Sequence, residues 1–396
     1  MAQTDATPEL RKKRRFFYLG NGFDMPFFIM LTIVIIIGLA TLYSASHVYA
    51  FNYNDGDSYF YIRKQLIFVA IGMVGMFGVS MVDYHILRKL AVPIWIFSIL
   101  LLIVALVMPS ASGINRWIRL PGLGQFQPSE LAKFALVLIF AQYISINYKR
   151  MKQARYGFWP LAVILGITCV LVLIEPHLSG TLLIGLLGFA LMFIGGTGIG
   201  WLLGTAGAGV AGVYVLTAFL GYEKDRIAVW HDPLGIYSHL EMIEEFGRTG
   251  RDLAWQTVQS LYAIGSGGLL GQGPGNSRQK HLFLPEPQND FIFSVYCEEM
   301  GFIGAVVLIV LFGLLVWRGL RIGLHAPDKF GSLLAIGLTL QIGLQVAINV
   351  AVVSNLMPNT GISLPFFSYG GTSILMLMLQ MGVVLSISRQ MHGEKE

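Results

Sequence analysis

The chain has 396 residues, of which 55% are hydrophobic and only 12% are charged. Because an ordinary soluble domain has about 25% charged residues, this composition excludes a soluble enzyme and predicts an all-α, polytopic membrane protein. The net charge of +5 comes from basic residues that flank apolar segments, so it does not indicate a nucleic-acid partner.

Apolar runs long enough to cross a membrane recur along the whole chain. A hydrocarbon core of about 30 Å needs roughly 17 to 25 helical residues, and ten runs meet this length. The sixth and seventh are separated by GGTGIG at 195–200, which indicates either a tight turn or a break within one long hairpin. The ten predicted spans are 26–46, 65–82, 91–108, 131–147, 158–174, 178–196, 198–220, 291–317, 331–353 and 368–388.

Basic residues predict the orientation of these spans. If the N-terminus is cytoplasmic, the inner segments hold 16 Lys and Arg and the short outer loops hold four, as the positive-inside rule requires. We therefore expect both termini in the cytoplasm, a basic N-terminal segment at 1–25 that precedes an anchoring span, and a large extracytoplasmic loop at 221–290 between spans seven and eight. Residues 1–396 then form one integral domain of a bacterial cytoplasmic membrane protein.

Two outer segments before the large loop carry charge. Arg116, in the glycine- and proline-rich loop 109–130, either faces lipid phosphates or anchors the interface next to Trp117. In QPSELAK at 127–133, Glu130 and Lys133 are three residues apart, so they share one helix face. The two charges either pair to lower their cost in lipid, or Glu130 holds Lys133 toward an anionic headgroup.

Cysteine and histidine give no sign of a metal site. Cys169 and Cys297 lie in apolar runs and are expected to pack as small hydrophobic residues. Glu175 and His177 flank Pro176 at the outer end of the fifth span, but no further ligands are spaced near them. We expect His177 to be a polar interface residue.

The large outer loop has three parts. Residues 223–233 have the pattern of an amphipathic segment on the membrane. Residues 255–275 begin as a helix with Gln256 and Gln259, then become rich in glycine without a nucleotide-binding pattern. Residues 276–290 carry charged side chains, which either form a solvated surface or line a site; these are Arg278, Lys280, His281, Glu286 and Asp290.

Asp290 is the last polar residue before an apolar helix that starts with Phe291. A carboxylate at this boundary is costly unless it is paired or used. One interpretation is that Asp290 caps the helix that follows, since aspartate is a common N-cap. The other is that it works where a lipid tail and a polar headgroup meet.

A second irregular segment follows the ninth span. Pro358 and Pro365 prevent a regular helix over 355–373, so its backbone needs partners from protein or from a watery cavity. The segment either lines the outer mouth of such a cavity, with Ser363, Ser368 and Tyr369, or is a re-entrant turn that only packs the bundle.

Three motifs together resemble the shape, elongation, division and sporulation family, which includes the rod-shape and septal peptidoglycan polymerases. They are QPSELAK at 127–133, GNSRQKHLFLPEPQNDFIFSVYCEEMG at 275–301 and NTGISLPFFSYGGTS at 359–373. The resemblance covers nearly the whole chain and is greater to the division and sporulation branch. Gln288 and Asn289 stand where the family commonly has His-Thr, and Asn359 stands where Thr is usual.

The resemblance implies an inverting glycosyltransferase that uses lipid II as donor and acceptor. Such a reaction needs a general base and cationic help for the leaving diphosphate. We predict Asp290 as the base and Lys133, oriented by Glu130, as the main phosphate partner. Further predicted contacts to substrate are Arg116, Arg278, Lys280, Gln259 and Ser368.

The resemblance also bears on cofactors and partners. The sequence shows no metal site, although a divalent cation such as Mg²⁺ or Mn²⁺ could share the diphosphate charge. The expected partners are a class B penicillin-binding protein and other division or elongation proteins. Two other function classes stay open: a lipid II flippase, which needs an ionisable path through the bilayer, and a noncatalytic scaffold that packs through small residues at 194–212.

Overall fold

The computed structural model describes residues 22–108, 116–120, 124–175, 177–218, 224–234 and 248–391. Eight helical segments in these ranges are long and apolar enough to cross a membrane, and a ninth apolar helix, α7, has 17 residues. The predicted all-α membrane fold is confirmed. Each predicted span overlaps one of ten helices: α1 (Met25–Tyr53), α2 (Phe60–Met81), α3 (His85–Val107), α4 (Pro128–Asn147), α6 (Trp159–Ile174), α7 (Leu178–Ile194), α8 (Ile199–Ala218), α12 (Ile292–Leu324), α13 (Lys329–Val353) and α14 (Gly371–Met391).

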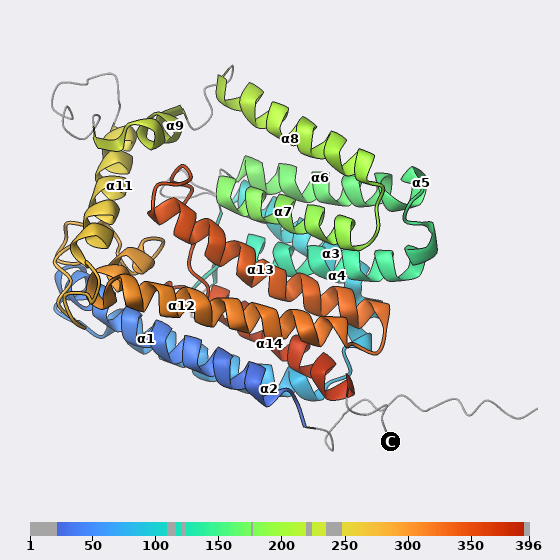
Figure 1. Ribbon diagram of the computed structural model, residues 1–396, viewed down its shortest axis with the longest axis horizontal. Coiled ribbons are helices and arrows are strands. Elements are labelled where there is room, and N and C mark those ends of the chain that lie inside the picture. Colours follow the sequence, from blue (N-terminus) through green and yellow to red (C-terminus); the bar gives the residue numbers. More distant parts are fainter. Residues whose placement is uncertain are drawn as a thin grey trace, which may run out of the picture.

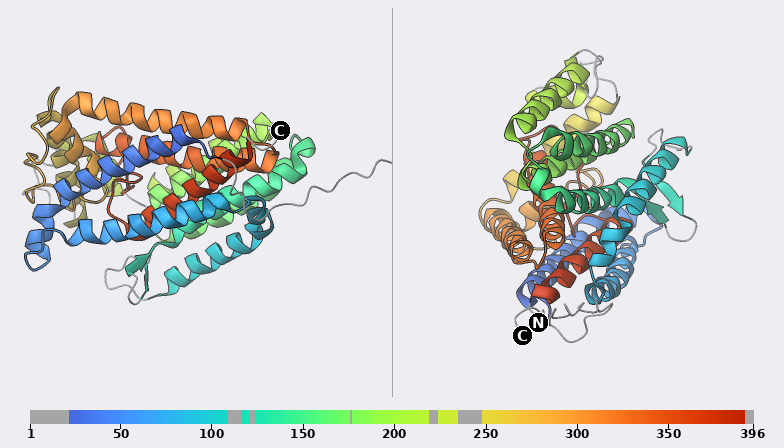
Figure 2. Two further views of the ribbon diagram at one scale, coloured as in Figure 1. Left: turned by 90° about the horizontal axis from the view of Figure 1, so that it is seen from below. Right: turned by 90° about the vertical axis from the view of Figure 1, so that its right-hand side faces the viewer.

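The long helices run roughly parallel and antiparallel in one bundle (Figures 1 and 2). Helices α4, α13 and α14 are mostly buried, while α3 and α12 expose much of their apolar surface. Glycines permit close packing between helices. A Cβ on Gly382 of α14 would lie 2.6 Å from the backbone oxygen of Met76 on α2. Only glycine therefore lets these two helices approach this closely.

The first and last helices are joined at one end of the bundle. Asp24 caps α1 by accepting a hydrogen bond from the N–H of Phe27 at 2.9 Å. Its carboxylate also pairs with Arg318 at 2.8 Å, and its own N–H donates to Ser388 Oγ at 3.1 Å. The start of α1 and the end of α14 therefore lie side by side at one end of the bundle. Which side of the membrane they face stays a prediction.

The irregular segments gather at the opposite end, on the left of Figure 1. There α9 (Lys224–His231) and α11 (Arg248–Ser266) lie close to segments 267–291 and 354–370. The helix expected after residue 255 begins already at Arg248, and no helix forms over 355–370, as Pro358 and Pro365 predicted. A short antiparallel hairpin, β1 (Ile118–Leu120) and β2 (Gly124–Phe126), was not predicted.

Short helical elements and a turn connect the long helices on the side that the predicted topology places in the cytoplasm. The η1 turn (Tyr148–Arg150) and α5 (Ala154–Gly157) connect α4 to α6. The GGTGIG motif separates α7 from α8, so of the two interpretations the turn is confirmed and the segment contains two helices. In Figure 1, α8 lies along the edge of the bundle beyond α6 and α7.

Candidate functional site

A polar pocket of about 120 Å³ lies at the end of the bundle where the irregular segments meet. The segment before α12, the segment between α13 and α14, α9 and the strand-bearing loop all contribute side chains to it. The pocket residues that matter for chemistry are Asp290, Glu286, Arg116, Arg226, Asn359 and Gly361. Asp290 is therefore in a concave polar site and does not point into a purely apolar surface.

The carboxylate of Asp290 does not cap α12. The capping position is Phe291, and no side chain makes a capping hydrogen bond there. The carboxylate instead lies against Gly361, where a Cβ would be 3.2 Å from Asp290 Oδ2. Gly361 has a φ of +70°, which side chains disfavour. Both the backbone conformation and the nearby carboxylate therefore favour glycine at position 361.

The surroundings of Asp290 adjust its acidity in opposing directions. The net effect raises the pKa of the carboxyl to about 6; burial is the largest cause, and the negative charge of Glu286 acts in the same direction. The positive charges of Arg116 and Arg226 lower the pKa and limit the shift. At neutral pH the carboxylate is therefore mostly ionised, and it is a stronger base than an ordinary aspartate.

Hydrogen bonds from side chains to backbone atoms join the Asp290 segment to segment 354–370. The amide of Asn349 donates to the backbone oxygens of Asp290 at 2.9 Å and Ile362 at 2.7 Å. The hydroxyl of Ser368 donates to the backbone oxygen of Asn289 at 2.8 Å and accepts the N–H of Leu364 at 2.8 Å. Ser368, a predicted substrate contact, thus holds the two segments together beside the pocket.

Glu130 and Lys133 form an ion pair of 2.8 Å, and both side chains are buried. The Lys133 ammonium also lies 3.4 Å from Gln345 Oε1, and Gln345 donates to the backbone oxygen of Ser363 at 3.0 Å. The pair therefore supports the same 354–370 segment that closes the pocket. The second carboxylate oxygen of Glu130 is buried without a hydrogen bond.

Two arginines bring positive charge to the pocket. Arg116, a predicted substrate contact, lines it together with Asp290. Arg226 of α9 also lines it, and its guanidinium donates to the backbone oxygen of Asn359 at 2.6 Å. Sequence reasoning missed Arg226, since only the amphipathic character of 223–233 marked this segment.

Glu175 and His177 extend the polar region on the side of α6 and α7. Burial raises the pKa of Glu175 to about 8, against the opposing charge of Arg116, and neither carboxylate oxygen has a hydrogen bond. Burial also lowers the pKa of His177 to about 3, helped by Arg116, Lys133 and Arg226. His177 is therefore neutral at physiological pH, and its Nε2 lies 3.2 Å from Gln127 Nε2.

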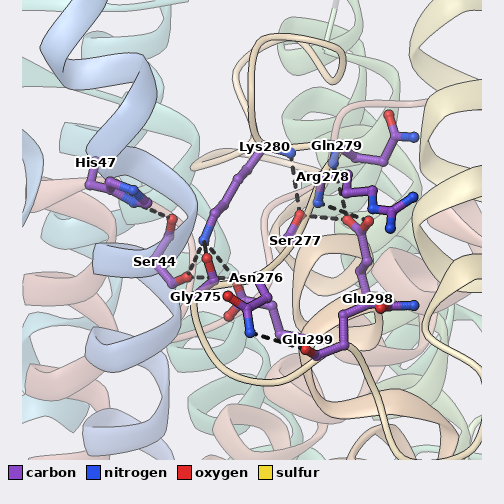
Figure 3. A network of polar contacts seen from close by, with 11 residues as sticks. Ser44, His47, Gly275, Asn276, Ser277, Arg278, Gln279, Lys280, Glu298 and Glu299 are labelled. Carbon is purple, nitrogen blue, oxygen red and sulfur yellow. Dashed lines mark hydrogen bonds and ion pairs between the residues drawn. The ribbon is translucent and has the colours of Figure 1, made fainter.

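Lys280 lies outside the pocket, in a network that fastens segment 271–284 to α1 and α12 (Figure 3). Its ammonium contacts Glu299 at 2.9 Å, Ser44 Oγ at 3.0 Å and the backbone oxygen of Gly275 at 2.6 Å. The side chain is fully buried. The three protein acceptors of the ammonium favour a structural role for Lys280 over the predicted substrate contact, which is not tested by these contacts.

The carboxylate of the neighbouring Glu298 holds segment 271–284 by binding backbone N–H groups of that segment. It accepts hydrogen bonds from the N–H groups of Arg278 at 3.0 Å and Gln279 at 3.2 Å and from the hydroxyl of Ser277. The Arg278 side chain lines a separate pocket of about 370 Å³. Gln259 is buried on α11. The structure therefore does not bring Arg278 or Gln259 to the Asp290 pocket.

Among the described residues, no group of three or more His, Cys, Asp and Glu side chains is arranged to hold a metal ion. Glu286 and Asp290 both line the pocket, and Glu286 also accepts a hydrogen bond from Asn289 at 2.8 Å. The protein ligands present there do not form a closed site, so a divalent cation would depend on oxygens from the substrate.

Comparisons with known proteins agree with this architecture. A family model for FtsW, RodA and SpoVE, described as a cell cycle protein, matches residues 24–393. A probable peptidoglycan glycosyltransferase FtsW of Geobacter sp. (strain M18) is 38% identical over 378 residues, covering 94% of this chain and 98% of that protein. The stage V sporulation protein E of Bacillus subtilis (strain 168) is 38% identical over 376 residues, covering 92% and 97%.

Solved structures are similar over almost the full length. A chain of a peptidoglycan synthase complex, whose structure concerns the coordination of polymerization and crosslinking, matches with a TM-score of 0.74 and 25% identity, covering 95% of this chain and 100% of that chain. The rod shape determining protein RodA of Thermus thermophilus matches with a TM-score of 0.65 and 27% identity, covering 95% and 99%. By sequence and by fold, the chain belongs to the FtsW/RodA/SpoVE family of membrane proteins.

Proposed function

We propose that the protein is a peptidoglycan glycosyltransferase that polymerises lipid II into glycan strands at the outer face of the bacterial cytoplasmic membrane. The observation that carries this proposal is the position of Asp290, a carboxylate with a pKa of about 6 in a polar pocket at the end of an apolar bundle. Two relatives of this chain are named as an FtsW glycosyltransferase and a sporulation protein, which supports a role in division or sporulation.

In the proposed reaction, Asp290 removes the proton from the hydroxyl of the acceptor sugar as that oxygen attacks the anomeric carbon of the donor. The bond from this carbon to the lipid diphosphate breaks, and the configuration inverts because no covalent intermediate with the protein forms. Arg116 and Arg226, which line the same pocket, stabilise the charge on the departing diphosphate. Lys133, paired with Glu130, does not line the pocket and adds positive charge at longer range.

A divalent cation such as Mg²⁺ or Mn²⁺, if bound, would share the negative charge of the diphosphate. Asp290 and Glu286 are the pocket carboxylates that would face it. If Asp290 both faced the cation and acted as the base, its ionisation would depend on whether the cation is bound.

The proposed partner is a class B penicillin-binding protein, the transpeptidase that crosslinks the strands, together with other division or elongation proteins. One support is the similarity to a chain of a peptidoglycan synthase complex that combines polymerization with crosslinking. The proposed topology has both termini in the cytoplasm, and the pocket then opens on the outer side.

The test uses the purified protein with its transpeptidase partner, lipid II as substrate and gel analysis of the strands. Asp290→Asn should reduce polymerisation by at least about 100-fold, the usual contribution of a general base. Glu286→Gln is the comparison variant: it removes a carboxylate from the same pocket but keeps the base, so it should lower polymerisation far less than Asp290→Asn. Full polymerisation by folded Asp290→Asn protein would remove the assignment of the base. Transfer of lipid II between leaflets without any polymer would favour a flippase.

A further inference from the structure

A cluster of tyrosine rings lies near the segment that carries Asp290 and extends to the C-terminal end of α1. The rings of Tyr49 and Tyr53 are stacked, with centroids 4.4 Å apart. Tyr49 lies 6.2 Å from Tyr61, and Tyr61 makes an edge-on contact of 4.8 Å with Tyr369. These four residues, here called the tyrosine shelf, come from α1, α2 and segment 354–370, so the fold assembles them from distant parts of the chain.

The inner end of the shelf is attached to the pocket segment. The N–H of Tyr369 donates to the backbone oxygen of Gln288 at 2.8 Å, two residues before Asp290. Glu286 lines the pocket, and its charge lies close enough to interact with both Tyr49 and Tyr61. The inner end of the shelf is therefore attached to the segment that carries Asp290, although none of its four rings lines the pocket itself.

The outer end of the shelf extends past the hydrocarbon core. Helix α1 has 29 residues, which at about 1.5 Å each gives a length of about 43 Å. A hydrocarbon core is only about 30 Å thick, so the last turns of α1, with Tyr49 and Tyr53, project beyond it on the pocket side. The Tyr53 side chain is 64% exposed. Its ring is available to a water-soluble ligand.

Polar side chains lie next to the rings of the shelf. The side chain of Asn54 makes a hydrogen bond to the hydroxyl of Tyr61, and its amide nitrogen is buried. An aromatic face has a negative potential that attracts C–H groups, and a pyranose ring presents a flat face of such groups. Stacked rings next to the Glu286 carboxylate match the C–H faces and hydroxyls of amino sugars.

We propose that the tyrosine shelf binds the saccharide chain of the growing glycan strand beside the Asp290 pocket. This inference rests on the proposed function, since it is the product of that reaction that would need a path over the outer surface. Because stacking on rings depends little on sequence or charge, the strand can advance by one repeat after each addition. The shelf then keeps the product attached between additions.

A matched control exists at the same end of the bundle. Tyr43 and Tyr59 are also stacked, with centroids 5.6 Å apart, and their side chains are 39% and 58% exposed. Their stacking contact is with each other and does not include a shelf ring. Tyr59→Ala thus removes an exposed ring of the same type from a pair that is separate from the proposed path.

The experiment measures binding without turnover, in the Asp290→Asn protein. The probe is a soluble, uncrosslinked octasaccharide of alternating β-1,4-linked N-acetylglucosamine and N-acetylmuramic acid, titrated by calorimetry. Tyr53→Ala should weaken binding by about 3- to 10-fold, the usual effect of one aromatic contact. Tyr53→Phe keeps the ring and should bind within about twofold of the parent, as should Tyr59→Ala.

Strand length gives a second measurement in the active protein. Tyr53→Ala should make shorter strands from lipid II while the rate of the first coupling stays within about twofold, because the shelf holds product and not monomer. Equal octasaccharide binding by the Tyr53→Ala and parent proteins would overturn the proposal. An equal loss of binding in Tyr53→Ala and Tyr59→Ala would also overturn it, and the tyrosines would then be an aromatic belt at the membrane interface. If the octasaccharide binds through Tyr53 but the wild-type protein makes no polymer, saccharide binding by the shelf is supported and the proposed function is contradicted.

Discussion

The side-chain amide of Asn349 donates a hydrogen bond of 2.9 Å to the backbone oxygen of Asp290. The same nitrogen donates to the backbone oxygen of Ile362 at 2.7 Å. One buried amide in α13 therefore fixes the distance between the proposed base and the opposite wall of the pocket, which includes Gly361. This arrangement makes Asn349 a positioning residue that need not touch substrate.

Asn349→Leu should lower the polymerisation rate by about 10- to 100-fold, because a displacement of about 1 Å can cost a factor of this size. Gln341→Leu is the control. Gln341 lies eight residues earlier on the same face of α13, is fully buried, and has no hydrogen bond on either side-chain atom. Its replacement should leave the rate within about twofold and maintain or raise the melting temperature. An Asn349→Leu protein with the wild-type rate would show that the positioning contact is unnecessary.

The pH dependence of polymerisation should report the ionisation of Asp290. The base works only when deprotonated, so kcat/KM should fall about tenfold per pH unit below a midpoint near 6. Glu286→Gln removes a charge that raises the pKa, so the midpoint should move to lower pH. Arg116→Gln removes a charge that lowers it, so the midpoint should move to higher pH. Measured rate profiles of the two variants that shift in the same direction would contradict this electrostatic description.

The sequence was sufficient to predict the helical spans and the irregular segment around Pro358 and Pro365, because bilayer thickness and proline geometry impose them directly. The position of Asp290 at the boundary between a polar loop and an apolar helix predicted a special role for this residue. The structure adds that Asp290 lies in a pocket and is not the N-cap of α12.

Contacts between distant segments were beyond sequence reasoning. Arg226 reaches Asn359 across 133 positions, and a charged residue in a short amphipathic segment has many possible partners. The polar residues of α13 offered a usable signal that was missed: Gln341, Gln345 and Asn349 recur every four residues in an apolar run, so they share one face. Such a stripe indicates a polar interior or a site next to that face.

Variants of the buried Glu130–Lys133 pair can distinguish a structural role of the pair from a role in substrate binding. Lys133→Met alone leaves Glu130 charged and unpaired in a buried site, which should cost about 3–5 kcal/mol of stability. The double variant Glu130→Gln with Lys133→Met removes both charges and should recover a melting temperature close to that of the wild type. If Lys133 supplies charge to the substrate, the folded double variant should still polymerise at least about 100-fold more slowly. An active double variant would assign the pair to packing alone.

For the Lys280–Glu299 pair we expect a structural role without a contribution to polymerisation. Their pair, 2.9 Å long and buried, lies in the network of Figure 3 outside the Asp290 pocket. Lys280→Met alone should destabilise the protein and increase hydrogen exchange in segment 271–284. Combined with Glu299→Gln, it should restore thermal stability and leave polymerisation within about threefold of the wild type. A folded double variant without activity would return Lys280 to the substrate-binding residues.

Gly361 offers the sharpest test of the space beside Asp290. Gly361→Ala adds a Cβ 3.2 Å from Asp290 Oδ2, at a backbone φ of +70°. Gly196 in the α7–α8 turn has a φ of +86° with no heavy atom within 4 Å of its Cβ position. Gly196→Ala therefore imposes similar left-handed strain, about 1 kcal/mol, without a new contact.

Both alanine variants should lose a similar amount of thermal stability, but only Gly361→Ala should slow polymerisation, by about tenfold or more, because its methyl group displaces the carboxylate that accepts the proton. The comparison of melting temperature with rate in the two proteins separates strain from displacement. Equal rates in Gly361→Ala and Gly196→Ala would mean that the Asp290 carboxylate works at a distance from segment 354–370, and the pocket wall would then have no part in orienting it.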